Sequence, residues 1–175
     1  MKMRIETSTS YRGRNARTNW PVLFGFIALA FAAGGLGALL SPGGSAGAAA
    51  WYAALSKPAW APPNRWFGPV WTTLYLLMGI AAWLIWRERY HRKRSVALLA
   101  YAVQLLLNAL WAPLFFGARN IGAGLFIVVA LWLAIIWTIR EFRPVRPLAA
   151  GLLIPYVLWV TVAMALNLRI WRLNP

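Results

Sequence analysis

Amide and aromatic side chains recur at helical spacing in three apolar stretches of the chain. Gln104 and Asn108 are four residues apart and Trp111 follows three residues later, so one helical face carries all three. Amides offer hydrogen bonds and aromatic rings offer flat apolar surface, which is the usual chemistry of a small-molecule pocket. Amides in membrane helices also bond neighbouring helices together, so spacing alone leaves both binding and packing open. Similar spacings join Trp71 to Tyr75 in an earlier stretch, and Trp159 to Ala163 and Asn167 in a later one.

The sequence contains few residues that could act as a catalytic acid or base or as a metal ligand. The chain has three Asp or Glu residues, one His and no Cys. His91 lies in the basic segment RERYHRKR, where a solvated side chain is expected. No Ser-His-Asp set, metal-ligand cluster or glycine-rich phosphate loop can be assembled from these residues. We therefore expect no catalytic residue and no metal site, and hydrolytic or metal-dependent catalysis is disfavoured.

The elements that must position these side chains are membrane helices. Of the 175 residues, 61% are hydrophobic and 12% are charged, against about 25% charged in soluble domains. A membrane-spanning helix needs about 20 apolar residues. The sequence therefore predicts an all-α integral membrane protein, a bundle of five transmembrane helices. The predicted spans are residues 20–40, 66–86, 95–116, 121–139 and 147–168, none of which contains a charged residue or histidine.

The distribution of basic residues predicts the orientation. The head, residues 1–19, and the second and fourth connections carry thirteen Lys or Arg residues, against five on the other side. The positive-inside rule places the head in the cytoplasm and the C-terminus outside. Residues 20–175 form one domain of five spans in this interpretation, which suits a bacterial cytoplasmic membrane, and the polar head is expected to be disordered. Because the basic residues lie between apolar runs, the net charge of +15 does not indicate nucleic-acid binding.

The first connection, residues 41–65, is the only long one. It ends in a proline-rich stretch, KPAWAPPNRWFGP at 57–69, that continues into the second span. Prolines lack the backbone donor and disfavour helix in the residue before them, so this stretch is expected to hold a fixed, non-helical shape. Trp60 and Trp66 are suited to anchor it at the membrane interface. Long loops in compact domains tend to be functional.

Four blocks of this sequence resemble the TspO/MBR family, whose members are the tryptophan-rich sensory proteins of bacteria and the mitochondrial translocator protein, or peripheral benzodiazepine receptor. The blocks stand in the family's order and cover nearly all the chain after the head. They are WYAALSKPAWAPP, GPVWTTLY, QLLLNALWAPLFFG and PYVLWVTVAMALN.

The resemblance implies a five-helix membrane bundle, often a homodimer, that binds porphyrins such as protoporphyrin IX in a pocket capped by the first loop. Family sterol recognition is associated with a Leu/Val–Tyr–Lys/Arg pattern at the end of the fifth helix. ALNLRIWRLN lacks the tyrosine, so the sequence leaves cholesterol binding open. The matching ligand-contact positions are Trp51, Tyr52, Trp71, Gln104, Asn108, Trp159 and Ala163, to which the helical spacing adds Tyr75 and Trp111. Trp60 of the first connection is also predicted to contact the ligand, and Pro58, Pro62 and Pro63 belong to the lid loop.

Three functions follow as hypotheses. The leading one is a receptor or sensor that binds porphyrins and other apolar ligands. The second is a transporter of porphyrin or another apolar metabolite, although no coupling-ion site is evident in the predicted spans. The third is an enzyme that degrades porphyrin in light through a pocket tryptophan, an activity reported for some family members. The expected partners are the lipid bilayer, a porphyrin-type tetrapyrrole and a second copy of the chain.

Overall fold

The computed structural model describes residues 19–40 and 44–175, and within these ranges every regular element is helical. The predicted basic head therefore lies outside the described residues, apart from Asn19. Four shorter elements join the long helices: α2 (Gly44–Ala54), η1 (Asn64–Trp66), η2 (Pro113–Gly117) and α6 (Pro147–Gly151). The long helices are α1 (Trp20–Leu39), α3 (Phe67–Arg87), α4 (Arg94–Ala112), α5 (Ile121–Val145) and α7 (Ile154–Leu173).

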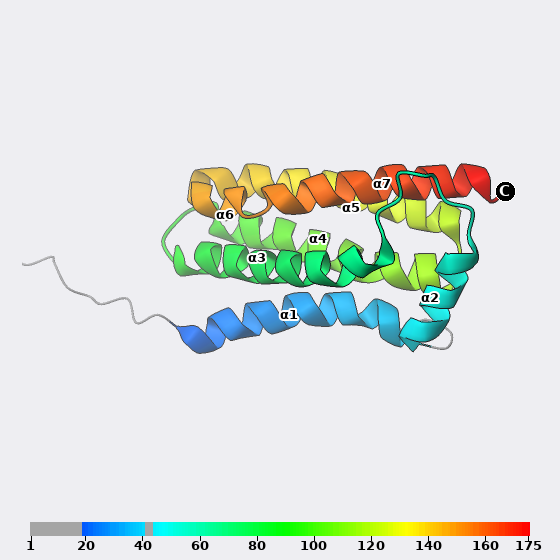
Figure 1. Cartoon of the computed structure of the whole chain (residues 1–175). Coiled ribbons are helices and arrows are strands. Elements are labelled where there is room, and N and C mark those ends of the chain that lie inside the picture. The colour runs from blue at the N-terminus through cyan, green and yellow to red at the C-terminus, as the bar shows by residue number, and fades with distance from the viewer. Residues whose placement is uncertain (1–18, 41–43) are drawn as a thin grey trace, which may run out of the picture.

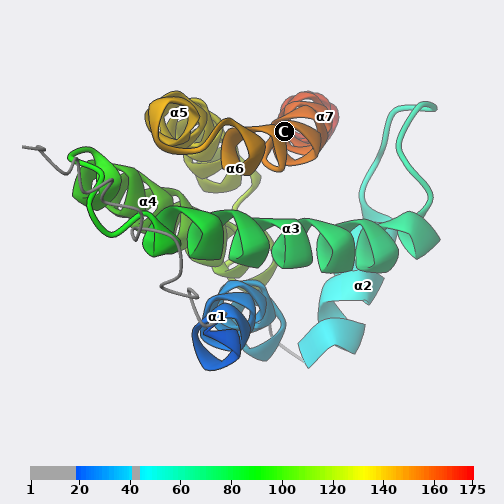
Figure 2. The same cartoon turned by 90° about the vertical axis from the view of Figure 1, so that its left-hand side faces the viewer.

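The long helices form three layers, in which α1, α5 and α7 lie along one direction and α3 crosses it obliquely (Figures 1 and 2). Helix α1 lies on one side of α3 and α4, and α5 and α7 lie on the other. Helix α1 begins at the end of the bundle where α3 ends and α4 begins. The chain ends at the opposite end, where α2 crosses the bundle (Figure 1). The first connection and the C-terminal residues, which are far apart in the sequence, therefore lie at the same end of the bundle.

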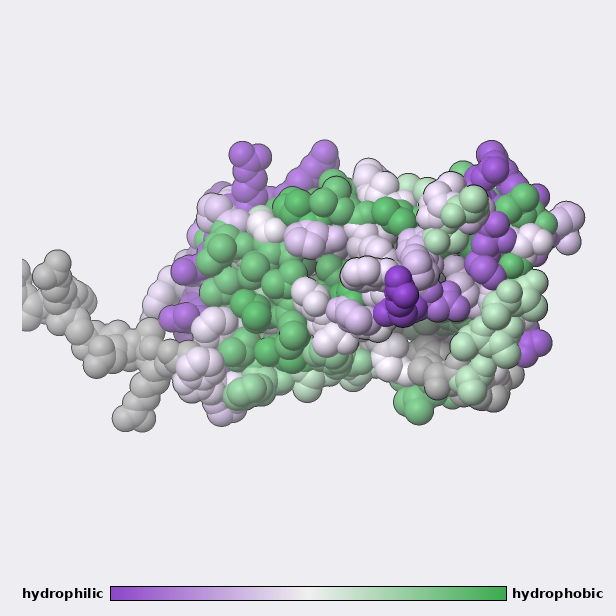
Figure 3. All heavy atoms as spheres, in the orientation of Figure 1, coloured by the Kyte–Doolittle hydropathy of each residue, from purple (hydrophilic) through white to green (hydrophobic). Residues whose placement is uncertain are grey.

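The outer surface of the bundle is apolar, as expected of helices in lipid. Four segments are long and apolar enough to cross a membrane, whereas α1 offers a shorter apolar stretch, Trp20–Leu36. Hydrophobic residues cover much of the middle of the molecule, and most hydrophilic ones gather toward its ends (Figure 3). The chain is therefore an integral membrane protein with all-helical structure, and the count of five spans stays a prediction. Large side chains exposed on this surface include Phe24, Leu76, Leu99, Leu106, Phe126, Leu133 and Leu158.

The two ends of the bundle differ in charge. One end holds the α3–α4 and α5–α6 connections and both acidic residues of the described ranges, each of which is paired with a base. An Arg146 guanidinium nitrogen lies 2.7 Å from a carboxylate oxygen of Glu88, and the Lys93 ammonium lies 3.8 Å from Glu141. The opposite end has only bases among the described residues: Lys57, Arg65, Arg119, Arg169 and Arg172.

Three predicted spans end differently from the sequence prediction. Helix α4 stops at Ala112, and Pro113 begins a π-helical turn that continues to Gly117. Helix α5 continues to Val145, six residues beyond the predicted end at 139. The fifth predicted span is broken at Leu152 and Leu153, between α6 and α7. Pro155 explains the break, because it has no N–H for the carbonyl of Gly151 and its ring crowds that carbonyl.

The prediction of residues 41–65 as a continuous loop was wrong for most of the segment described. Residues 44–54 form α2, because the segment is rich in alanine, the residue with the highest helix propensity. Residues 57–63 are non-helical as predicted. Residues 64–69 are helical, since η1 leads directly into α3 and Pro69 falls in the first turn, where proline is tolerated.

Candidate ligand-binding site

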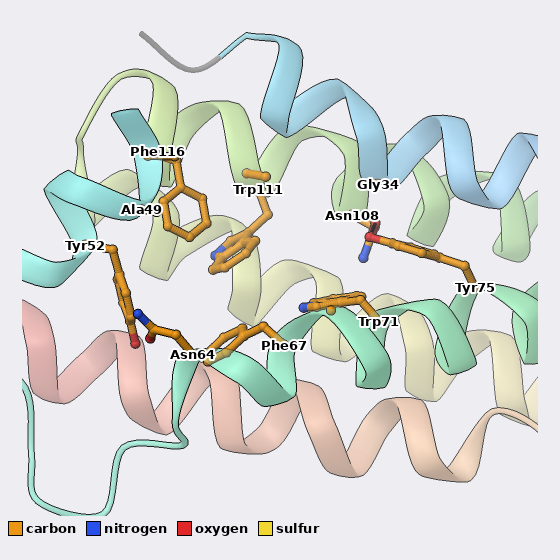
Figure 4. A pocket seen from close by; sticks show the side chains of 13 residues that line it. Gly34, Ala49, Tyr52, Asn64, Phe67, Trp71, Tyr75, Asn108, Trp111 and Phe116 are labelled. Atoms are coloured by element: carbon orange, nitrogen blue, oxygen red, sulfur yellow. Dashed lines mark hydrogen bonds between the residues drawn. The ribbon is translucent and has the colours of Figure 1, made fainter. Parts of the chain in front are cut away.

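A cavity of about 460 Å³ lies near the end of the bundle where α2 crosses it. Helices α1, α2, α3 and α4 and the turns η1 and η2 all contribute to its wall. Its size falls in the range of about 300–1,000 Å³ that is typical of small-molecule pockets. Figure 4 shows most of the lining side chains, which are largely aromatic or very small.

The wall from α3 is a stripe of aromatic rings. Phe67, Trp71 and Tyr75 follow one another at intervals of four residues, so all three face the cavity. The rings of Trp71 and Tyr75 are stacked, with centroids 5.3 Å apart and planes inclined by 25°. Trp71 also meets the ring of Tyr156 edge-on, at 6.3 Å. These contacts fix the orientation of the Trp71 face against which a ligand would lie.

Asn108 supplies the main polar group of the inner wall. Its amide nitrogen donates to the hydroxyl of Tyr156 at 3.0 Å, and the hydroxyl of Tyr75 donates to its amide oxygen at 3.4 Å. An amide can accept and donate at once, so Asn108 satisfies two tyrosines on different helices. Asn108 is only 5% exposed, so the amide is held by α3 and α7 before any ligand arrives.

Two helices approach the cavity closely because their lining residues are small. Gly34 of α1 faces the ring of Tyr75, and a Cβ atom at this position would collide with that ring. On α2 the lining positions are Ala48 and Ala49, followed by Tyr52 one turn later. Any larger side chain at these alanines would project into the cavity.

The remaining contacts of α2 are aromatic. Trp51 packs edge-on against Phe115 and Phe116, with ring centroids 5.4 and 6.2 Å away. Tyr52 meets Phe67 and Phe116 at 6.2 and 6.1 Å. Burial raises the pKa of the Tyr52 hydroxyl, which has no hydrogen-bond partner in the part of the chain that the structure describes, so this group stays protonated at neutral pH.

The structure brings five of the predicted ligand-contact residues into the cavity wall. These are Tyr52, Trp71, Tyr75, Asn108 and Trp111. Asn108 and Trp111 thus lie on the same face of α4, and that face borders the cavity. The helical spacing predicted this shared face. Helix α4 supplies both, together with Ala112 at its end.

The other predicted residues are not in the wall. Gln104 is 1% exposed in the core, and neither atom of its amide has a hydrogen-bond partner among the described residues. Trp159 packs edge-on against the outer side of the α3 stripe, 5.7 Å from Phe67. Trp60 lies on the connection between α2 and η1 and is 51% exposed. Trp51, Ala163 and the lid prolines Pro58, Pro62 and Pro63 also lie outside the lining.

Several lining residues escaped the sequence prediction. Gly34, Ala48 and Ala49 carry no functional group, so nothing in their type marks them. The helical spacing could have predicted Phe67, because it lies four residues before Trp71 on the same face. Asn64 and Phe116 lie in η1 and η2, two turns that the sequence prediction did not contain.

Comparison with known proteins gives the same assignment as the four sequence blocks. The sequence profile of the TspO/MBR family matches residues 26–172. This chain belongs to the TspO/MBR family. The human translocator protein is 44% identical over 126 residues, which cover 71% of this chain and 75% of the human protein. Among bacterial TspO/MBR relatives, Protein CrtK of Rhodobacter capsulatus is 44% identical over 151 residues, 86% of this chain and 90% of that protein.

A third TspO/MBR relative is the tryptophan-rich sensory protein of Cereibacter sphaeroides. It is 38% identical over 157 residues, or 89% of this chain and 93% of the relative. The similarity therefore extends through α1–α7 and includes every element that lines the cavity. In chemical terms this TspO/MBR cavity offers aromatic faces, an oriented amide and no charged side chain among its lining residues. Such a wall is suited to bind a flat apolar molecule and holds no acid or base for proton transfer.

Proposed function

We propose that this protein is a membrane receptor or sensor that binds porphyrins, such as protoporphyrin IX, and other apolar ligands in the cavity beside α2. The observation that carries the proposal is the cavity of about 460 Å³ whose wall combines the Phe67–Trp71–Tyr75 stripe with Asn108. A porphyrin is a large, flat aromatic ring, so it gains both apolar burial and stacking against such walls. The resemblance of the four sequence blocks to porphyrin-binding family members supports the same ligand class.

Transport is the second candidate, because relatives in human, pig and sheep are named translocator protein. A transport path would have to continue from the cavity through the other half of the bundle. Fully buried side chains, including Met78, Ile85 and Phe142, occupy the core of that half. This core packing supports a binding site over a continuous conduit through the middle of the bundle.

The arrangement in the membrane is also part of the proposal. We take α1 as a fifth span beside the four longer apolar segments, with its N-terminal end in the cytoplasm. The excess of Lys and Arg in the head and in the α3–α4 and α5–α6 connections supports this orientation. A bacterial cytoplasmic membrane and a homodimer complete the proposed setting, the latter on the family resemblance.

Titration of the detergent-solubilised protein with protoporphyrin IX tests the proposal, with binding followed by the absorbance of the porphyrin. We expect saturable binding that Trp71→Leu weakens at least about tenfold, a loss of about 1.4 kcal/mol. Trp60→Leu is the matched control, since Trp60 lies outside the cavity wall and should change the affinity less than about threefold. Absence of saturable binding, or an equal loss in both variants, would remove the proposal.

A further inference from the structure

The side chain of Asn174 joins the end of α7 to the connection that follows α2. Its amide oxygen accepts from the backbone N–H of Ser56 at 3.0 Å. Its amide nitrogen donates to the backbone carbonyl of Ser56, also at 3.0 Å, and to the carbonyl of Ile170 at 2.8 Å. One side chain thus pairs with both backbone groups of a residue 118 positions earlier and with its own helix.

Ser56, to which Asn174 bonds, is held close to the end of α2. Ser56 comes two residues after the end of α2, and its neighbour Lys57 closes that end of the helix. The Lys57 ammonium donates to the carbonyls of Tyr52, Ala53 and Leu55 at 2.7, 3.0 and 2.9 Å and lies 4.9 Å from the centre of the Tyr52 ring. These bonds satisfy carbonyls that a helix end leaves without a partner. Helix α2 and residues 55–57 are therefore bonded into one unit.

Helix α2 is the shortest α-helix in the cavity wall. It crosses the end of the bundle and lacks the length of contact that the long helices have with one another (Figure 1). The connection after it, residues 57–63, projects from the side of the bundle and leaves Trp60 largely exposed (Figure 2). Trp51, Tyr52 and Leu55 pack in an apolar cluster with Phe115, Leu166 and Ile170. Among the side-chain hydrogen bonds of the described structure, those of Asn174 are the ones that tie this unit to the rest.

We propose that Asn174 is a positioning residue that latches α2 against α7, and so controls how readily the cavity opens. Ser56 is exposed and Asn174 is half-buried, so water competes for these bonds and the latch can release without unfolding the bundle. Release lets α2 swing away and widens the entrance beside Ala48, Ala49 and Tyr52. The consequence for ligand exchange rests on the proposed function, whereas the latch itself is a property of the empty protein.

Hydrogen exchange of the ligand-free protein tests the latch directly. In Asn174→Ala we expect the α2 amides to exchange about tenfold faster than in the wild type, which corresponds to about 1.4 kcal/mol and lies within the range expected for loss of these hydrogen bonds. The amides of α4 should be unchanged. Ser56→Ala is the matched control, because the latch uses only the backbone of Ser56 and should survive this change. Unchanged exchange in α2, or equal acceleration in α2 and α4, would overturn the inference.

A second variant and a kinetic measurement separate a latch from a merely structural contact. Asn174→Asp keeps the acceptor for the Ser56 N–H and loses the donor, so its α2 exchange should lie between the wild type and Asn174→Ala. With protoporphyrin IX as probe, Asn174→Ala should raise association and dissociation rates together and leave Kd within about threefold, because both directions pass through the open state. If Asn174→Ala changed only the association rate or only the dissociation rate, and Kd with it, the result would contradict the latch. If the wild type does not bind the probe, the proposed function fails, and the exchange result still decides on Asn174.

Discussion

At the scale of single residues, Asn108 is the group on which the cavity's geometry depends. It lies on α4, and its two tyrosine partners lie on α3 and α7, so one amide joins three helices. Tyr156 is completely buried, which means that its hydroxyl has no alternative partner in solvent. A buried polar group left without a partner costs more than its hydrogen bond contributes when formed.

A double-mutant cycle on Asn108 and Tyr156 tests this dependence. Asn108→Ala should lower the free energy of unfolding by about 1–3 kcal/mol, because it leaves the Tyr156 hydroxyl unpaired. Tyr156→Phe should cost less in the Asn108→Ala background than in the wild type, with a coupling of about 1 kcal/mol. Chemical denaturation in mixed detergent micelles measures all four proteins. Strictly additive losses would show that the bond seen in the structure contributes nothing.

Gly34 allows a sharper test of close packing at the cavity. A methyl group there meets the Tyr75 ring, whereas one at the adjacent Gly35 meets nothing within 4 Å. Gly34→Ala should therefore push Tyr75 away from Asn108, lower the stability by about 1–3 kcal/mol and weaken porphyrin binding. Gly35→Ala should leave both properties near wild type, as measured by thermal unfolding and titration. Equal behaviour of the two variants would contradict the packing of α1 on α3.

At the scale of elements, α2 is the wall that determines how much room the cavity has. Ala49 lines the cavity and its neighbour Ala50 does not, although both are exposed to the surroundings in the ligand-free protein. We expect Ala49→Phe to lower the affinity for protoporphyrin IX at least about tenfold by occupying the space that the ligand needs. Ala50→Phe adds the same ring on a different face and should have little effect. A comparable loss from Ala50→Phe would mean that the ligand binds elsewhere.

The sequence predicted the long helices well because each is a run of apolar residues of membrane length, and such runs have few other stable structures in lipid. It did not predict α2, because a segment of mostly alanine and glycine shows no alternation of apolar and polar residues and carries few functional groups. Gln104 and Asn108 show the limit for the site: they share a face and a chemistry, yet only Asn108 reaches the cavity. Which turn of α4 meets open space depends on the packing of α1 and α3, and that information is not local to α4.

At the scale of the whole molecule, the proposed orientation can be checked because the chain has no cysteine. Tyr90 lies in the α3–α4 connection and is 99% exposed, and Trp60 lies at the opposite end. In spheroplasts, a membrane-impermeant maleimide should label Trp60→Cys directly and Tyr90→Cys only after permeabilisation, because the proposed orientation places the end with more Lys and Arg residues in the cytoplasm. The reverse pattern would invert the assignment.

The basic residues at the cavity end have a consequence for how fast a ligand arrives. The cavity lies at the end where the described residues include five bases and no acid, so this end attracts negative charge from a distance. Protoporphyrin IX carries two carboxylates on its rim, and such long-range attraction is screened as ionic strength rises. The rate of association should therefore fall with added salt for the free acid and stay nearly constant for its uncharged dimethyl ester, measured by stopped-flow absorbance. Basic residues outside the cavity lining would then favour the arrival of tetrapyrroles that carry free carboxylates.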